Sequence, residues 1–222
     1  MNDLKRLIKS ARYPAALTGA GISAPSGIPT FQGSYKGRPL RDYLTRDYME
    51  DHPIDFFDLY CDMVKWCEKE PNLAHYALKE LNVRVITQNI DGLHAKAGST
   101  DALEMHGSLR FVLCHGCGWR EDSAEFAARY REARAQGDQA ALHALRCPVC
   151  GEAIDTDVVL YSDAVRHLSE AIDIASSCDL FLVIGTSLVT YPAAGLPDVA
   201  RQSGAKVIMI NDDCIKAFSD EE

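Results

Sequence analysis

Two pairs of cysteines are the clearest chemical signal in this 222-residue chain. Cys114 and Cys117 form one Cys-x-x-Cys pair, and Cys147 and Cys150 form the second. Glycine or proline follows closely in each pair, as in tight turns that present two thiolates to one metal ion. Four thiolates complete the tetrahedral shell of Zn²⁺ and leave no position for a substrate. We therefore predict one structural zinc ion per chain, with two redox-active pairs as the alternative.

Polar side chains crowd the end of an apolar run at residues 83–87. Gln88, Asn89 and Asp91 follow this run directly, and His94 completes the stretch TQNIDGLH. A simple turn after a strand does not require so many hydrogen-bonding groups. In an open α/β sheet, ligands bind beyond the carboxyl ends of the strands, so this stretch is a candidate ligand loop.

Three further apolar runs are also followed by small or polar residues. The first ends in the loop that begins at Gly19 and fits the pattern G-x-G-x-x-A. Glycines in such a loop let a pyrophosphate approach the backbone N–H groups, although the pattern alone is also common in ordinary turns. The other two runs end at Gly185-Thr186-Ser187 and at Asn211. The agreement of four strand ends predicts a ligand site, and the glycine loop makes a dinucleotide one candidate ligand.

His106 is the candidate general base. It lies 12 residues after His94 and 8 residues before Cys114, where the predicted sheet meets the cysteine-bearing segment. A cleft is expected at such a junction, and neutral imidazole accepts protons near pH 7. A histidine that is only hydrogen-bonded inside the structure is the alternative.

The elements that must position these residues alternate between strand and helix. Near-continuous apolar runs are typical of strands buried on both faces of a parallel sheet. The expected strands are 15–18, 83–87, 180–184 and 205–210, and the expected helices are 55–69, 72–81, 164–177 and 192–203. The sequence therefore predicts an α/β fold, with a Rossmann-like parallel sheet domain and a small inserted zinc-ribbon and helical module.

The expected boundaries divide the chain into three parts. The Rossmann-like domain takes residues 1–31, 75–110 and 155–222. Residues 32–74 form a helical insertion that includes a cofactor-binding loop, and residues 111–154 form the zinc-binding module. A helix near 122–136 is expected to fill the space between the two cysteine pairs.

Composition limits the classes of partner. The formal net charge is −9, and no basic cluster of the kind that binds nucleic acid is visible. No apolar run approaches the length of a membrane span, and the N-terminus lacks the apolar core of a signal peptide. We therefore expect a cytoplasmic protein that contacts neither membrane nor nucleic acid directly.

These motifs together resemble one family, the sirtuins, which are Sir2-like NAD-dependent protein-lysine deacylases. The resemblance rests on GAGISAPSGIPTFQG, TQNIDGLH, the His106-Gly107 pair, the two cysteine pairs and GTSLVTYPA, which occur in this order. It extends from about residue 15 to Asn211. It implies a Rossmann-type domain with a small zinc module, and a cleft between them that receives NAD and an acyl-lysine peptide.

The resemblance also implies a role for each matching residue. His106 matches the catalytic base, and Asn89 and Asp91 match the pocket in which the nicotinamide–ribose bond breaks. Val158 and Val159 match the strand that pairs with the substrate peptide. The implied NAD contacts are Gly19, Ala20, Gly21, Ser23, Phe31, Gln32, Gln88, Ile90, Gly185, Thr186, Ser187 and Asn211.

The implied activity is lysine deacylation, giving free lysine, nicotinamide and O-acyl-ADP-ribose. An ADP-ribosyltransferase or NAD hydrolase stays open as an alternative, because it needs the same bond cleavage without the same acceptor. A non-catalytic zinc protein that binds NAD or a peptide is a third possibility, for which the short stretch after Asn211 is the best argument.

Two sites in the chain depart from the family pattern, and a third bears on the acyl group. Gln32 stands where arginine is usual, which predicts weaker NAD binding. Tyr161-Ser162-Asp163 replaces the usual Phe-Gly-Glu next to the peptide strand. Tyr60 and Met63 correspond by spacing to a Tyr-x-x-Arg pair that selects acidic acyl chains, and methionine offers no cation. An apolar acyl chain, by default acetyl, is therefore expected, unless these two side chains only pack their helix.

Overall fold

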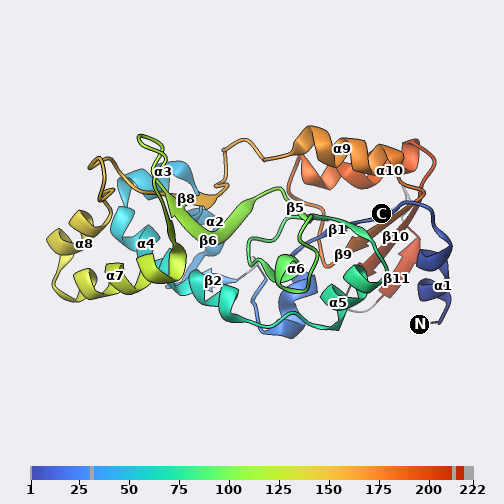
Figure 1. Ribbon diagram of the computed structural model, residues 1–222, viewed down its shortest axis with the longest axis horizontal. Coiled ribbons are helices and arrows are strands. Elements are labelled where there is room, and N and C mark those ends of the chain that lie inside the picture. Colours follow the sequence, from blue (N-terminus) through green and yellow to red (C-terminus); the bar gives the residue numbers. More distant parts are fainter. Residues whose placement is uncertain (1, 31–32, 212–213, 218–222) are drawn as a thin grey trace.

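The computed structural model describes residues 2–30, 33–211 and 214–217, and they form two lobes side by side (Figure 1). The lobe at the right contains a six-stranded sheet in the order β11-β10-β9-β1-β4-β5. Its strands are β1 (Pro14–Thr18), β4 (Arg84–Thr87), β5 (Leu103–Glu104), β9 (Leu180–Ile184), β10 (Lys206–Asn211) and β11 (Cys214–Ala217). Neighbouring strands run parallel, except for the antiparallel pair β10–β11. The predicted parallel sheet is confirmed.

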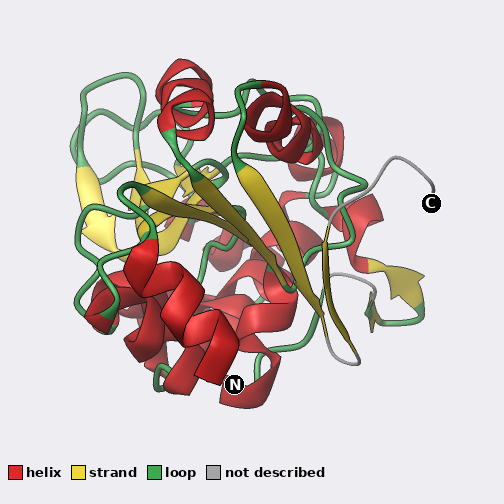
Figure 2. Ribbon diagram, turned by 90° about the vertical axis from the view of Figure 1, so that its right-hand side faces the viewer, coloured by secondary structure: helices red, strands yellow, loops and turns green. Residues whose placement is uncertain are grey.

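Helices cover both faces of this sheet (Figure 2). Because successive strand residues point to opposite faces, Leu17 and Val183 face one side while Ala16 and Leu182 face the other. The first side packs against α9 (Leu168–Ser177) and α10 (Leu196–Gln202), and the second against α1 (Asn2–Ser10) and α5 (Leu73–Glu80). Burial on both faces explains why the strands are almost purely apolar.

The second lobe is a module that combines both predicted insertions. One core joins Phe56, Phe57 and Tyr60 of α4 (Pro53–Val64) to Phe126 and Tyr130 of α7 (Ser123–Ala135). The other elements are β2 (Ser34–Tyr35), β3 (Arg38–Pro39), α2 (Leu40–Tyr43), α3 (Arg46–Asp51), η2 (Lys65–Glu68) and α8 (Asp138–Ala144). The helix expected near 122–136 is present as α7.

A three-stranded antiparallel sheet completes the module. Its order is β7-β6-β8, made of β6 (Gly107–Leu113), β7 (Arg120–Asp122) and β8 (Asp155–Val158). β6 crosses the boundary expected at residue 110, and β8 lies beyond the one expected at 154. Strand pairing between segments distant in sequence draws both strands into the module, and this pairing was not visible in the sequence.

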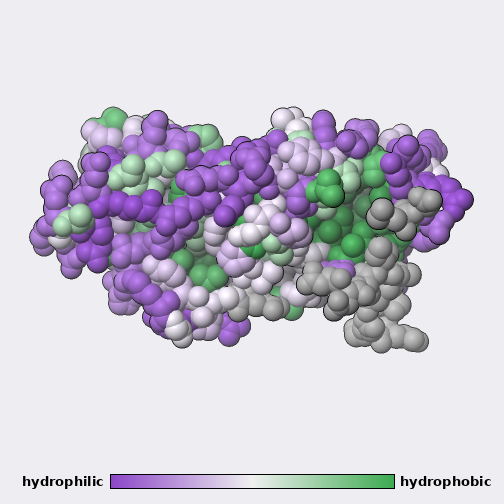
Figure 3. Space-filling model, turned by 90° about the horizontal axis from the view of Figure 1, so that it is seen from below, coloured by the Kyte–Doolittle hydropathy of each residue, from purple (hydrophilic) through white to green (hydrophobic). Residues whose placement is uncertain are grey.

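The surface differs between the lobes. Seen from below, hydrophilic side chains cover most of the module, whereas apolar atoms gather over the sheet domain (Figure 3). Among the helices that the structure describes, none has the length and apolar character required to cross a membrane.

Candidate functional site

Two glycine-bearing loops meet where β1 and β9 end. Gly19 precedes the 3-10 helix η1 (Ala20–Ser26), and the N–H of Gly21 donates to the carbonyl of Gly185 at 2.8 Å. A Cβ on Gly21 would lie 2.7 Å from the Cα of Gly185, and one on Gly185 would lie 2.3 Å from the nitrogen of Ile22. The backbones of the two loops, which together we call the glycine cradle, are therefore in direct contact.

We expect Gly185→Ala to weaken NAD binding by tenfold or more, since the new methyl group must push the two loops apart. Isothermal titration with NAD measures the effect. Gly204→Ala is the matched control, because Gly204 also has a positive φ, of 96°, but has open space around its Cβ position. If both variants bind NAD equally well, the contact between the loops is not what shapes the cofactor site.

The loop after β4 is bonded to the first glycine loop. The amide nitrogen of Asn89 donates to the carbonyl of Gly19 and to the hydroxyl of Ser23, both at 3.1 Å. That hydroxyl donates to the carboxylate of Asp91 at 2.6 Å, and the other carboxylate oxygen caps the helix α6 (Leu93–Lys96) by accepting from the N–H of Leu93. Asn89 and Asp91 are almost fully buried, so their orientations are fixed before any ligand arrives.

One buried acceptor in this network is free. The side-chain oxygen of Asn89 has no hydrogen-bond partner among the described residues. A buried polar atom without a partner is costly, and a bound ligand that donates a hydrogen bond would satisfy it. A small hollow adjoins it, lined by Ala20, Ile28, Pro29, Trp66, Asn89, Ile90 and Asp91. Its lining combines apolar side chains with one amide and one carboxylate.

His106 adjoins the same loop. Its Nδ1 lies 3.0 Å from the carbonyl oxygen of Gln88. Because a carbonyl can only accept, the proton of the neutral ring sits on Nδ1 and the lone pair remains on Nε2. Burial lowers the pKa of His106 below its ordinary value, although the bond to Gln88 acts in the opposite direction. The imidazole is therefore neutral at pH 7 and has the tautomer of a general base.

The remaining NAD candidates after β9 and β10 lie around the same cradle. The hydroxyl of Thr186 donates to the side-chain oxygen of Gln88 at 2.8 Å, and the amide of Asn211 contacts the carbonyl of Thr186 at 3.4 Å. Ser187 is exposed beside them. The structure thus brings the predicted residues of four strand ends together. Phe31 and Gln32 lie outside the described residues.

Asn72 is a positioning residue that the motif analysis missed. It caps α5 by accepting from the N–H of Ala74, and its amide nitrogen donates to the carbonyl of Ile22 at 2.7 Å and to the hydroxyl of Ser26 at 3.0 Å. Asn72 therefore ties the glycine loop to the start of α5. An asparagine just before a helix is a recognised N-cap signal, but its second bond depends on tertiary contact.

Two histidines are buried below the ligand loop. His94 is 2% exposed, its Nε2 contacts the hydroxyl of Thr18 at 2.9 Å, and its ring centroid is 4.8 Å from that of His75. Burial, with the neighbouring His75 as a smaller cause, lowers the pKa of His94 to about 3. This neutral pair packs the loop from beneath.

Stability is therefore expected to fall in mild acid. A histidine with a folded pKa near 3 takes up its proton on unfolding once the pH drops below the unfolded value of 6.5, so His94 removes about 2 kcal/mol from the free energy of unfolding between pH 7 and pH 5. Urea melts at the two pH values measure this loss, which His94→Gln should reduce. The exposed His143, changed in the same way, is the control. An unchanged pH dependence in the His94 variant would exclude this cause.

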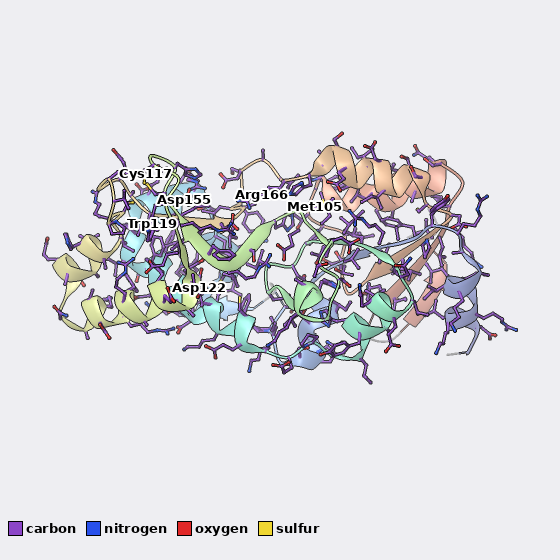
Figure 4. All side chains as sticks on the ribbon, viewed as in Figure 1. Met105, Cys117, Trp119, Asp122, Asp155 and Arg166 are labelled. Carbon is purple, nitrogen blue, oxygen red and sulfur yellow. The ribbon has the colours of Figure 1, made fainter. Side chains whose placement is uncertain are left out.

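The four predicted cysteines converge in the module. Their sulfur atoms all lie within 4.8 Å of one another, with 3.5 Å between Cys114 and Cys150 and 3.6 Å between Cys117 and Cys147. A tetrahedral zinc with Zn–S bonds of about 2.3 Å needs sulfur separations of about 3.8 Å, so the donor set fits. Cys117 lies in the same part of the module as Trp119 and Asp155 (Figure 4).

The substrate candidates fall into two groups. Val158 and Val159 lie where β8 ends, and the N–H of Val159 donates to the carbonyl of His106 at 2.9 Å. Tyr60 and Met63 are each 1% exposed inside the module core, and the Tyr60 hydroxyl bonds to Ser123 and to the carbonyl of Phe111. This placement favours the alternative that Tyr60 and Met63 pack their helix rather than select an acyl chain.

Known proteins share this sequence and this fold. A model described as the Sir2 family matches residues 19–192. A protein named NAD-dependent protein deacetylase 1, from Pyrobaculum aerophilum, is 37% identical over 96% of this chain and 84% of its own length. NAD-dependent protein deacylase 2, from Archaeoglobus fulgidus, is 38% identical over 92% of this chain and 82% of its own length.

Solved structures agree with the sequence relatives. A structure described as Sir2 with a p53 peptide and NAD⁺ superposes with a TM-score of 0.82 at 33% identity, over 95% of this chain and 86% of the other. A structure of Sir2Tm bound to a propionylated peptide gives a TM-score of 0.81 at 31% identity over the same shares. Both sequence and architecture are therefore similar along nearly the whole chain.

Proposed function

The chain belongs to the Sir2 family, and on this premise we propose that it is an NAD-dependent protein-lysine deacylase. The reaction transfers an acyl group, by default acetyl, from a lysine side chain to the ADP-ribose part of NAD. The products are free lysine, nicotinamide and O-acyl-ADP-ribose. One structural zinc ion per chain is held by the four cysteines.

The bond between His106 and Gln88 is the observation that carries this proposal. It fixes the imidazole so that Nε2 is the proton acceptor, and it ties the base to the same loop that contains Asn89 and Asp91. Cleavage of NAD alone requires no base acting on a sugar hydroxyl. A base built into the ligand loop therefore supports transfer of an acyl group rather than simple hydrolysis.

Each residue has a defined task in the proposed reaction. As nicotinamide departs, the sugar carbon of NAD becomes electrophilic and the acyl-amide oxygen of the lysine bonds to it. One water molecule is consumed before the lysine amine is released. Asn89 presents its free side-chain oxygen to the carboxamide, and the buried Asp91 places a negative charge near the developing positive charge. His106 accepts a proton from a ribose hydroxyl at Nε2, which makes that oxygen the acceptor of the acyl group. The glycine cradle holds the pyrophosphate.

The peptide is proposed to add as a strand beside residues 158–159. An extended substrate gains main-chain hydrogen bonds in this way, independent of its sequence. The bond from the N–H of Val159 to the carbonyl of His106 sets the strand close to the base. The thiols and the cysteine tetrad support a reducing, cytoplasmic location.

A single incubation tests the proposal. Purified protein, NAD and an acetyl-lysine peptide are mixed, and nicotinamide, deacetylated peptide and peptide mass are followed. Equal amounts of nicotinamide and free lysine are expected. Nicotinamide without deacetylation would indicate an ADP-ribosyltransferase or NAD hydrolase, and the absence of nicotinamide would indicate a binding protein.

A further inference from the structure

Arg46 joins two parts of the chain that lie on either side of the proposed peptide strand. One guanidinium nitrogen donates to the carboxylate of Asp155 and another to that of Asp163, both at 2.8 Å. Asp155 is the first residue of β8, and Asp163 lies in the turn beyond it. Arg46 itself lies at the start of α3, far away in sequence. One side chain therefore forms hydrogen bonds with both ends of residues 155–163, which we call the β8 segment.

The middle of the β8 segment contacts the catalytic base. Val158 pairs with Gly107, the residue after His106, and the N–H of Val159 donates to the carbonyl of His106. A Cβ on Gly107 would lie 1.9 Å from the carbonyl of Asp157, so the two chains touch without intervening side chains. A displacement of the β8 segment would therefore move the peptide strand relative to the base.

Figure 4 shows how this part of the chain spans the junction between the lobes. Asp155 lies within the module, whereas Arg166 lies next to Met105, and the N–H of Arg166 donates to the Met105 carbonyl at 2.9 Å. Arg166 also pairs with Asp157 at 2.6 Å. The chain between these residues passes from the module to the sheet domain, so its position there depends on the side chains that bond to it.

The end of the β8 segment is bonded to the same part of the module as Arg46. The N–H of Tyr161 donates to the carbonyl of Leu44 at 2.8 Å, and Thr45 forms a bridge with Tyr161. Ser162 adopts φ of 80°, a left-handed conformation that costs a serine free energy. Such a conformation persists where the surroundings hold it, and Arg46 binds the next residue, Asp163.

The cluster contains one guanidinium group and two carboxylates. The side chains of Arg46, Asp155 and Asp163 are 29%, 12% and 27% exposed, so water screens them only in part. His115 also contacts the carboxylate of Asp155, at 3.0 Å. Partial burial acts to raise the pKa of Asp163, but hydrogen bonds from Arg46 and from the N–H of Leu160 lower it below its ordinary value.

We propose that Arg46 is a positioning residue for substrate recognition, because it holds the β8 segment at the distance from His106 that an acyl-lysine peptide requires. Its hydrogen bonds go to Met49, Asp155 and Asp163, none of which is a predicted NAD contact. The inference rests on the proposed deacylase function and adds a determinant of peptide affinity. A planar guanidinium that binds two carboxylates at once has no equivalent in lysine, which provides a single point charge.

The test compares steady-state kinetics of the wild type, Arg46→Met and Arg46→Lys. We expect Arg46→Met to raise KM for the acetyl-lysine peptide about tenfold, the size of a lost charge-assisted hydrogen bond, while KM for NAD stays within twofold. Arg46→Lys should give an intermediate value. Arg134→Met is the matched control, because Arg134 also bonds two carboxylates, Asp58 and Asp138, but none in the β8 segment.

Hydrogen exchange gives a second measurement that does not depend on activity. Amides of residues 158–163 should exchange about tenfold faster in Arg46→Met than in the wild type or in Arg134→Met. If the wild type does not deacylate at all, the proposed function fails, and this exchange result still decides whether Arg46 holds the segment. Unchanged exchange, an unchanged peptide KM, or an equal rise in both KM values would overturn the role of Arg46.

Discussion

Replacing His106 by alanine is expected to lower kcat for deacylation by about 10²–10⁴-fold, the usual contribution of a positioned general base. The variant should still bind NAD, because the glycine cradle and the Asn89–Asp91 network do not depend on the imidazole. Some nicotinamide exchange should remain, since breaking the nicotinamide–ribose bond does not need the base. The measurement is the rate of deacetylated peptide beside the rate of labelled nicotinamide exchange into NAD.

The pH dependence of kcat/KM for the wild type should also depend on His106. Burial lowers the pKa of His106, so the ring stays neutral to a lower pH than an exposed histidine. The acid limb of kcat/KM is therefore expected below pH 6.5, the ordinary histidine value, and deacylation should be lost as the pH falls through that limb. His143→Ala, on the exposed surface of α8, is the control. Full deacylation by the His106 variant would exclude this residue as the base.

Removing the metal is expected to abolish deacylation and to unfold most of the module. Four like-charged thiolates held within 4.8 Å of one another repel strongly without a cation, and structural zinc in small domains contributes about 10–16 kcal/mol of apparent binding free energy. Because β6 runs from Gly107 to Leu113, its two ends adjoin His106 and Cys114. Loss of structure at the cysteines is therefore expected to displace His106, because β6 connects the two.

A chelator titration can distinguish the effect of metal loss on the module from its effect on the sheet domain. Circular dichroism, zinc content by mass spectrometry and NAD affinity are measured on the same samples. Cys150→Ser should lose zinc and module structure, whereas Cys178→Ser should keep both, because Cys178 lies in the core of the sheet domain. Zinc well below one ion per chain in a folded, active protein would contradict the four-thiolate assignment.

The sheet and its ligand loops were predictable because they depend on local patterns. Apolar strands followed by small or polar residues placed Gly19, Asn89 and Gly185 at one edge, and the structure brings these loops into contact. The spacing of the cysteines likewise predicted the tetrad. In both cases the residues that make up the site are close together in the sequence. Predicting them therefore required no knowledge of how the chain packs.

Contacts made across the fold could not be predicted in the same way. Arg46 looked like any charged residue at a helix start, and its two carboxylate partners lie more than a hundred positions away. Tyr60 matched a motif by spacing, but the aromatic core encloses it. The predicted boundaries at 110 and 154 followed local composition, whereas β6 and β8 pair with each other across a long stretch of sequence.

His106 is bonded both to the loop after β4 and to the β8 segment. Its ring bonds to Gln88 on the side of the glycine cradle, and its main-chain carbonyl bonds to Val159 on the side of the β8 segment. The two substrates of a deacylase would therefore influence each other through a single residue. Binding of the peptide is therefore expected to improve the alignment of His106 with NAD. An enzyme whose base is fully aligned only when the peptide is bound hydrolyses little NAD without transferring an acyl group.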